Sequence, residues 1–163
     1  MSDVQVEKPS ITRIAALDYG LARIGIAVSD ESKTIALPFM TLGCEKKTSD
    51  TAKKLVLLLE EHQKANHYTL LELVIGLPLL MNGKRGYLAD ETQYFISLLK
   101  NLLSIPVVSW DERLTSVQAE RTMKEGKLNR KKRAKSVDNV AAIIILQNYL
   151  DHLKLRHGGT YGF

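Results

Sequence analysis

The first part of the chain contains three short apolar segments that predict neighbouring strands. Each is rich in Ile, Val, Ala or Leu, and together they span Arg13–Asp18, Arg23–Ser29 and Thr34–Leu42. Turn-forming residues such as Gly20 and Asp30 separate them. Because connections this short usually join antiparallel strands, the pattern predicts an antiparallel meander.

Farther along the chain, apolar residues recur at helical spacing and alternate with buried strands. The pattern predicts a helix around Ala52–Leu59, a strand at Leu73–Leu77, a helix over Leu88–Leu102 and a strand from Val107 to Trp110. Alternating strands and helices imply parallel pairing with right-handed crossovers. We therefore expect an α/β fold, with a mixed five-stranded sheet of antiparallel meander and parallel strands flanked by helices.

The last third of the chain predicts a closing helical segment. Thr115 and Gln118 have capping-box spacing, which predicts a helix that ends near Gly126. A final helix is expected from about Val137 to Lys154. The resulting β-β-β-α-β-α-β-α order is the ribonuclease H-like arrangement. We expect one domain over residues 13–154, with flexible tails at 1–12 and 155–163.

Composition narrows the classes of protein that fit this pattern. The chain has 163 residues, of which 45% are hydrophobic, and a single cysteine, so no intrachain disulfide is possible. The N-terminal residues lack the apolar core of a signal peptide. The longest apolar run, Val140–Leu146, is too short to span a bilayer. These features predict a cytoplasmic protein with no membrane association.

Positive charge is concentrated in one segment, residues 121–135. Eight basic residues and one acid give this segment a net charge of +7, whereas the remainder of the chain carries −2. Such a block suits contact with a polyanion, because neutralising phosphates drives nucleic-acid affinity. A solvated loop that keeps the protein soluble explains the charge equally well.

Three acidic positions are candidates for chemistry. Asp18 closes the first strand, where burying a charge is costly unless something pairs with it, although a turn aspartate is the simpler explanation. Asp111 and Glu112 close the last strand, at the carboxyl end where α/β proteins usually bind ligands. Neighbouring residues of a strand face opposite ways, so only one of these two acids can share a face with Asp18, and the other can pair with Arg113.

The third acidic position, Asp138, lies in the first turn of the final helix. The helix dipole alone favours an acid there. However, Ala141, Ala142, Ile145 and Tyr149 follow on the same helical face. This apolar stripe should pack on the sheet, so Asp138 is expected to point toward the ends of the strands.

Converging carboxylates predict a divalent metal site. Such groups repel one another in a partly dry site, and Mg²⁺ or Mn²⁺ would neutralise them. Two ions about 3.5–4 Å apart can activate water and stabilise the leaving oxygen of a phosphodiester. The sequence has no Walker motif and no serine-nucleophile elbow. Of the reactions considered, phosphodiester hydrolysis is therefore the one that these residues fit best.

Four motifs resemble the YqgF (RuvX) family, whose members are described as Holliday junction resolvases or pre-16S rRNA nucleases. The resemblance is carried, in order, by Leu17–Asp30, Ile75–Gly83, Asp111–Ser116 and Val137–Ala142. It covers about Arg13 to Asp151. One such motif would be weak evidence, whereas four in the same order are highly specific.

The resemblance implies catalytic and metal-binding roles for Asp18, Glu112 and Asp138, and two Mg²⁺ or Mn²⁺ ions, at least one arriving with substrate. It also favours nucleic-acid contacts by Arg23, Arg113, Lys127, Arg130, Lys131, Lys132, Arg133 and Lys135. The implied function is an endonuclease that processes the 5′ end of pre-16S rRNA, acting as a monomer or weak homodimer. The alternatives are a resolvase of branched DNA and a non-catalytic nucleic-acid-binding factor.

Overall fold

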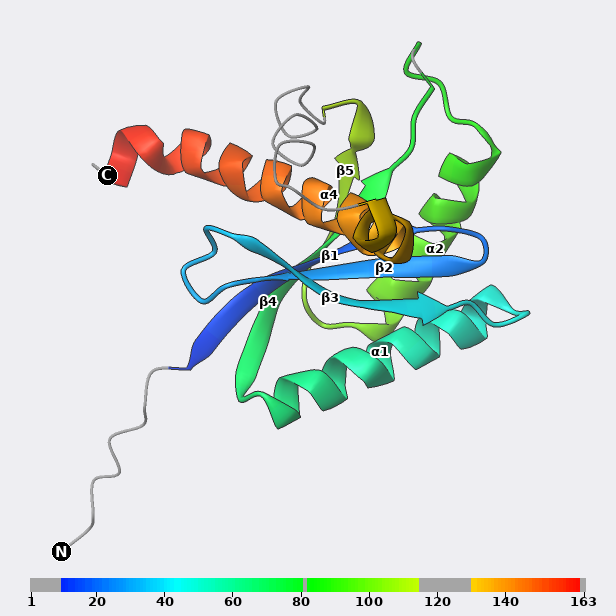
Figure 1. Cartoon of the computed structure of the whole chain (residues 1–163), viewed down its shortest axis with the longest axis horizontal. Helices are drawn as coiled ribbons and strands as arrows, with labels where there is room; N and C mark the ends of the chain where they lie inside the picture. Colours follow the sequence, from blue (N-terminus) through cyan, green and yellow to red (C-terminus); the bar gives the residue numbers. More distant parts are fainter. Residues whose placement is uncertain (1–9, 81, 115–129, 162–163) are drawn as a thin grey trace, which may run out of the picture.

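The computed structural model describes residues 10–80, 82–114 and 130–161 (Figure 1), with side chains at these positions other than 114, 130–139 and 157–161. The elements are β1 (Ile11–Tyr19), β2 (Arg23–Ser29), β3 (Ala36–Gly43), α1 (Thr48–Ala65), β4 (Tyr68–Leu77), α2 (Tyr87–Leu102), β5 (Val107–Asp111), a 3₁₀ turn (Glu112–Leu114) and α4 (Arg130–Tyr161). The expected helix at 115–126 lies outside the described residues.

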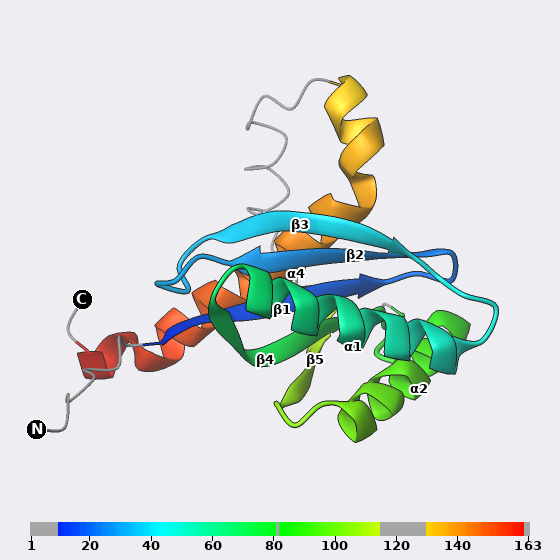
Figure 2. The same ribbon diagram turned by 90° about the horizontal axis from the view of Figure 1, so that it is seen from below.

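The described strands form one five-stranded mixed sheet in the order β3-β2-β1-β4-β5. Strands β1, β2 and β3 pair antiparallel, as the short connections predicted. Strands β4 and β5 extend the sheet parallel to β1. Helices α1 and α2 cover one face and α4 crosses the other (Figure 2). The predicted α/β fold class is confirmed.

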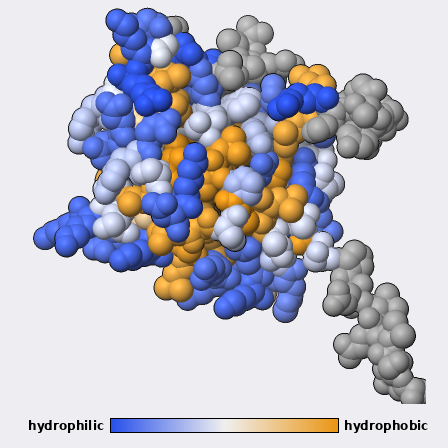
Figure 3. Space-filling model, turned by 180° about the vertical axis from the view of Figure 1, so that it is seen from behind, coloured by the Kyte–Doolittle hydropathy of each residue, from blue (hydrophilic) through white to orange (hydrophobic). Residues whose placement is uncertain are grey.

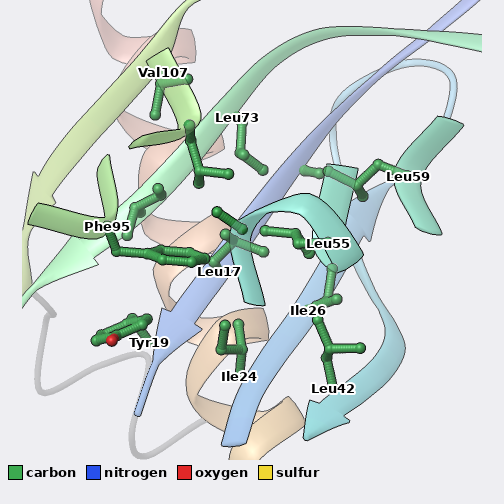
Figure 4. Packing of buried hydrophobic residues seen from close by; sticks show 14 of the residues in the cluster. Leu17, Tyr19, Ile24, Ile26, Leu42, Leu55, Leu59, Leu73, Phe95 and Val107 are labelled. Atoms are coloured by element: carbon green, nitrogen blue, oxygen red, sulfur yellow. The ribbon is translucent and has the colours of Figure 1, made fainter. Parts of the chain in front are cut away.

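The alternating side chains of β1 supply both hydrophobic cores. Ala15, Leu17 and Tyr19 belong to the cluster under α1 and α2, shown in Figure 4. Ile14 and Ala16 belong to a second cluster under α4. A strand buried on both faces reads as a continuous apolar run, which is the pattern of this segment. The alternation also fixes the face on which every later residue of β1 lies.

Helix α4 is longer than the sequence pattern predicted. It begins at Arg130, within the expected basic loop, and continues to Tyr161, within the expected C-terminal tail. Residues 130–136 contain no glycine or proline, and arginine, lysine and alanine favour helices. Apolar periodicity missed this extension because it marks only the helical turns that pack on a core. The predicted start at Val137 and the predicted end at Lys154 are therefore corrected.

A glutamine of α4 fixes the helix against the edge strand. Its side-chain oxygen accepts the N–H of Ala36, at 2.9 Å, and its amide nitrogen donates to the carbonyl of Thr34, at 3.0 Å. Gln147 thus satisfies backbone groups where β3 begins. Two hydrogen bonds from one side chain restrict how α4 can slide across the sheet.

The surface is mixed in polarity. Seen from the side opposite to Figure 1, hydrophobic side chains gather near the middle of the face and hydrophilic ones along its outline (Figure 3). Within the described ranges, no helix combines the length and apolar character needed to span a membrane.

Candidate active site

Asp18 lies at the carboxyl end of β1, on the face covered by α4. It is two residues beyond Ala16, which packs under α4, and strand alternation keeps both on the same face. Asp18 pairs with Gly25 of β2, and its neighbour Leu17 pairs with Ile75 of β4. The side chain is only partly buried. Asp18 is thus placed between two strands, where a second group can approach from β4 or β5.

Gly76 supplies the space for that second group. It follows Ile75 on β4 and, like Val74, belongs to the face under α4. A Cβ atom added to Gly76 would lie 2.6 Å from Oε1 of Glu112 and 2.5 Å from Cδ1 of Ile145. Real Cβ atoms do not come this close to other heavy atoms. Glycine is therefore required if the Glu112 carboxyl is to rest on the backbone of β4.

Glu112 lies directly after β5 and turns its carboxyl group inward. Burial, together with the nearby charges of Asp18 and Asp111, raises the pKa of this carboxyl to about 7. The effect of Asp18 on this pKa means that the two carboxyl groups share one environment. Residues 94 positions apart in the sequence thus meet at the carboxyl ends of β1 and β5.

Asp111 forms an ion pair with Arg113. The guanidinium Nη2 donates to Oδ2 of Asp111 at 2.7 Å, and Nε lies 3.1 Å from both carboxylate oxygens. The backbone N–H of Arg113 also donates to Oδ1, at 2.9 Å. These bonds hold the pKa of Asp111 below its usual range. Of the two neighbouring acids, the geometry gives the ion pair to Asp111 and leaves Glu112 facing Asp18.

The other predicted site residues are placed only in part. Asp138 lies in α4, seven residues before Ile145. The structure describes the backbone but not the side chains of Asp138, Arg130, Lys131, Lys132, Arg133 and Lys135. Lys127 lies outside the described residues. Arg23 begins β2 beside the β1–β2 turn, where its carbonyl accepts the N–H of Gly20 at 3.0 Å, and its side chain is exposed.

The sequence reasoning missed two features of this site. Gly76 interrupts an otherwise apolar strand, and such a glycine is a signal of close approach by another group. The second feature is the contact between Arg113 and Gly83, in the connection from β4 to α2. A Cβ at Gly83 would lie 3.2 Å from Nη1 of Arg113, and Gly83 has a φ of +81°. Nothing in the sequence pattern marks that contact.

The oxygen donors of Asp18 and Glu112 suit a hard divalent cation. Burial and the charge of Asp18 raise the pKa of Glu112, so a cation bound nearby would stabilise both carboxylates. Within the part of the chain whose side chains are described, no group of three His, Cys, Asp or Glu residues forms a complete metal site. Asp18 and Glu112 are thus two oxygen donors that could contribute to such a site.

The chain has the fold of the ribonuclease H-like nucleases. RuvC from Thermus thermophilus in complex with Holliday junction substrate has the same fold, with a TM-score of 0.59, 13% identity and coverage of 90% of this chain and 96% of that one. The large terminase nuclease from the thermophilic phage G20c matches with a TM-score of 0.51 and 13% identity, over 87% of this chain and 83% of that one. At such identities these likenesses concern the fold.

Residues 12–152 match the RuvX family, described as Holliday junction resolvase, and the chain belongs to that family. A protein of Protochlamydia amoebophila is 51% identical over 144 residues, which cover 88% of this chain and 96% of the relative. One of Rhodobacter capsulatus is 42% identical and covers 97% of each chain. Both bear the name "Putative pre-16S rRNA nuclease". The family and the fold are those of hydrolases that act on phosphodiester bonds.

Proposed function

We propose that this protein is a cytoplasmic, divalent-metal-dependent endonuclease that processes the 5′ end of pre-16S rRNA. The observation that carries the proposal is the meeting of Asp18 and Glu112 on one face, at the carboxyl edge of the sheet. The names of the relatives from P. amoebophila and R. capsulatus supply the substrate.

Asp138 completes the proposed ligand set. It is four residues before Ala142 and seven before Ile145, which both pack on the sheet, so helical periodicity puts its position on the same face of α4. Asp18, Glu112 and Asp138 would hold Mg²⁺ or Mn²⁺, with two ions in the active complex and at least one arriving with substrate. These ions would supply a hydroxide nucleophile and charge stabilisation for the leaving oxygen.

The protonation state of Glu112 is coupled to cation binding at this site. With a pKa of about 7, its carboxyl group holds a proton for roughly half of the time at neutral pH when no cation is present. A cation bound beside Asp18 would favour the ionised form of Glu112. The two acids are therefore arranged to bind a cation and to release a proton as it binds.

The basic residues would hold the nucleic-acid backbone. Arg23 is exposed next to the β1–β2 turn, close to Asp18 in the sequence. Arg113 keeps its Nη1 group outside the bonds that its Nε and Nη2 make to Asp111. The remaining proposed contacts are Lys127, Arg130, Lys131, Lys132, Arg133 and Lys135. Contacts of this kind fix the backbone without reading its sequence.

A resolvase of branched DNA is the second candidate. It is favoured by the description of the matching family as Holliday junction resolvase. The same acids would cut a DNA phosphodiester, but two equivalent strands require two active sites related by symmetry. The ribosomal RNA proposal needs only a monomer or a weak homodimer.

The deciding experiment offers both substrates to the purified protein. Pre-16S rRNA and a four-way DNA junction are incubated in parallel, each with Mn²⁺ and with EDTA, while the solution mass is measured at the same protein concentration. We expect Mn²⁺-dependent cleavage near the 5′ end of the RNA. Symmetric nicking of the junction by a dimer would favour the second candidate. Binding of either substrate without any cleavage would support a non-catalytic factor and contradict the proposal.

A substitution in α4 tests the backbone contacts. Replacing Arg130, Lys131, Lys132 and Arg133 with neutral residues should weaken binding to all RNA sequences alike. With four phosphate contacts removed, the slope of log K against log salt should fall by about 3 for a single strand. An altered sequence preference with an unchanged slope would count against these contacts.

A further inference from the structure

A hairpin follows β4 at the edge of the sheet that carries Asp18 and Glu112. We define the β4–α2 hairpin by its described residues, 79–80 and 82–85, in which Leu79 and Arg85 form a bridge. Leu80 donates its N–H to the carbonyl of Lys84 at 2.9 Å, and Gly83 donates to the carbonyl of Leu80 at 2.8 Å. The left-handed φ of Gly83 suits a short hairpin loop. Figure 1 shows this connection extending beyond the sheet, above β4.

The β4–α2 hairpin lies close to the turn that carries Glu112. The guanidinium group of Arg113 is beside Gly83, where an added Cβ atom would be 3.2 Å from Nη1. The same guanidinium pairs with Asp111. Because Glu112 lies between Asp111 and Arg113 in the chain, the hairpin is near the segment that carries this acid.

The surface beside this hairpin is apolar and has a basic rim. Tyr87 is 70% exposed and Leu80 is 51% exposed. Leu80 lies against Gly86, the residue before Tyr87, since its Cδ2 is 3.6 Å from the position of a Cβ there. Lys84 and Arg85 are both exposed on the hairpin. Exposed apolar groups next to cations suit a ligand that has flat apolar faces and negative charges.

The start of α2 is close to the catalytic edge but unsuited to a phosphate. Tyr19 follows Asp18 and stacks on Phe95 of α2, with ring centroids 4.7 Å apart, so α2 packs against the end of β1. The first turn of α2 carries Asp90. Asp90 and Glu91 would repel a phosphate at Tyr87. A ligand is therefore expected to place an uncharged group on Tyr87 and its phosphates on the hairpin.

We propose that the β4–α2 hairpin and Tyr87 form a binding site for single-stranded nucleic acid next to the acids. A base stacks on the ring of Tyr87, and the adjoining phosphates are held by Lys84 and Arg85. Stacking needs a base whose face is free, which a duplex does not offer. This inference rests on the proposed nuclease function, and it makes an unpaired segment the substrate at the point of cleavage.

The test compares binding of a single strand with binding of a duplex. Fluorescence anisotropy in EDTA gives the Kd for an RNA oligonucleotide of about 16 nucleotides, and for the same RNA annealed to its complement. Tyr87→Ala should weaken single-strand binding by roughly 5- to 100-fold, with little effect on the duplex. Tyr87→Phe should retain most of the affinity because it keeps the ring. Tyr94→Ala, an exposed tyrosine farther along α2, is the matched control and should change neither Kd.

The charges are tested separately. Lys84→Ala combined with Arg85→Ala should lower the salt slope for a single strand by about 1.4, the value for two lost phosphate contacts. Lys53→Ala combined with Lys64→Ala removes two exposed charges from α1 and should leave the slope unchanged.

The possible outcomes separate this inference from the proposed function. If the wild-type protein neither binds nor cuts RNA, the proposed function fails. If the wild type cuts RNA while Tyr87→Ala binds both ligands as the wild type does, the stacking site is refuted and a protein partner becomes the better occupant of this surface. Equal weakening for strand and duplex would also overturn the preference for unpaired nucleic acid.

Discussion

Glu112 and Asp30 are carboxyl groups at opposite edges of the sheet, and the structure treats them in opposite ways. Asp30 follows β2 and accepts the backbone N–H groups of Thr34, at 2.8 Å, and Ile35, at 3.0 Å. The hydroxyl of Ser32 donates to its other oxygen at 2.7 Å. These bonds lower the pKa of Asp30 to about 2, whereas burial and nearby charge raise that of Glu112 to about 7.

The difference separates an acid that organises a turn from an acid that, under the proposed function, binds a cation. The charge of Asp30 is favoured by the folded protein, because the β2–β3 turn directs donors at it. The charge of Glu112 is disfavoured, because the carboxyl is partly buried beside Asp18. A protein keeps a destabilised group when function needs it, and clusters of perturbed acids mark such sites.

The largest expected effect comes from removing charge at the active edge. Asp18→Asn should reduce Mn²⁺-dependent RNA cleavage by roughly 10³-fold or more, since losing one charged ligand removes several kcal/mol of transition-state stabilisation. Initial cleavage rates at saturating Mn²⁺ measure this loss. Asp30→Asn removes a comparable charge at the other edge and should leave the rate unchanged. Equal rates for the wild type and Asp18→Asn would refute the assignment of the site.

Displacing Glu112 without altering its chemistry should have the next largest effect. Gly76→Ala puts a methyl group where Oε1 of Glu112 and Cδ1 of Ile145 now lie. Moving a catalytic group by about 1 Å can cost on the order of 10²-fold in rate. Mn²⁺ binding by calorimetry should weaken together with the rate.

Gly43→Ala provides the control for that substitution. A Cβ at Gly43 meets no other atom within 4 Å, so this variant should bind Mn²⁺ and cut RNA as the wild type does. Thermal melting of both variants distinguishes a displaced carboxyl from a fold that has been lost. Full activity in a folded Gly76→Ala protein would contradict the close fit described here.

Glu112 should also destabilise the metal-free protein as it ionises. Its pKa is raised in the folded state, so the folded protein binds more protons than the unfolded chain between about pH 4.5 and 7, and stability falls as pH rises through that window. Glu112→Gln removes this loss and should stabilise the protein at pH 8, in EDTA, by about 2 kcal/mol. Partial solvation of the carboxyl group limits the gain to this size. Urea unfolding at pH 4.5 and at pH 8 measures the difference. An advantage for Glu112→Gln that is the same at both pH values would show that ionisation is not its cause.

Asp30 should show the opposite pH dependence and the smallest effect. Its pKa is lowered in the folded state, so its contribution is present above about pH 4 and is lost as pH falls toward 2. Because the group is largely exposed to solvent, Asp30→Ala should cost only about 1 kcal/mol at pH 7. Urea unfolding of both proteins at pH 7 and at pH 2.5 tests this, and a cost that grows on acidification would be inconsistent with it.

The order of the strands and helices could be predicted because it depends on local periodicity. The apolar runs of β1, β2 and β3 and the stripe of α2 marked the elements, and short turns marked the antiparallel pairs. Their ends were less well predicted: β4 begins at Tyr68, five residues before the predicted strand. The missed residues alternate between buried and exposed positions, but the exposed Leu71 hides this alternation in the sequence.

The sequence by itself determined the fold class, the family and the position of Asp18, since each is recorded in a local pattern of residues. The tertiary structure decided which of Asp111 and Glu112 pairs with Arg113, because that pairing depends on the fork of Arg113 around one acid and on the space above Gly76 for the other. The first is a geometry within one turn, and the second is a contact between separate segments. Periodicity in the sequence encodes neither. The environment that sets the pKa of Glu112 exists only when β1, β4 and β5 lie side by side.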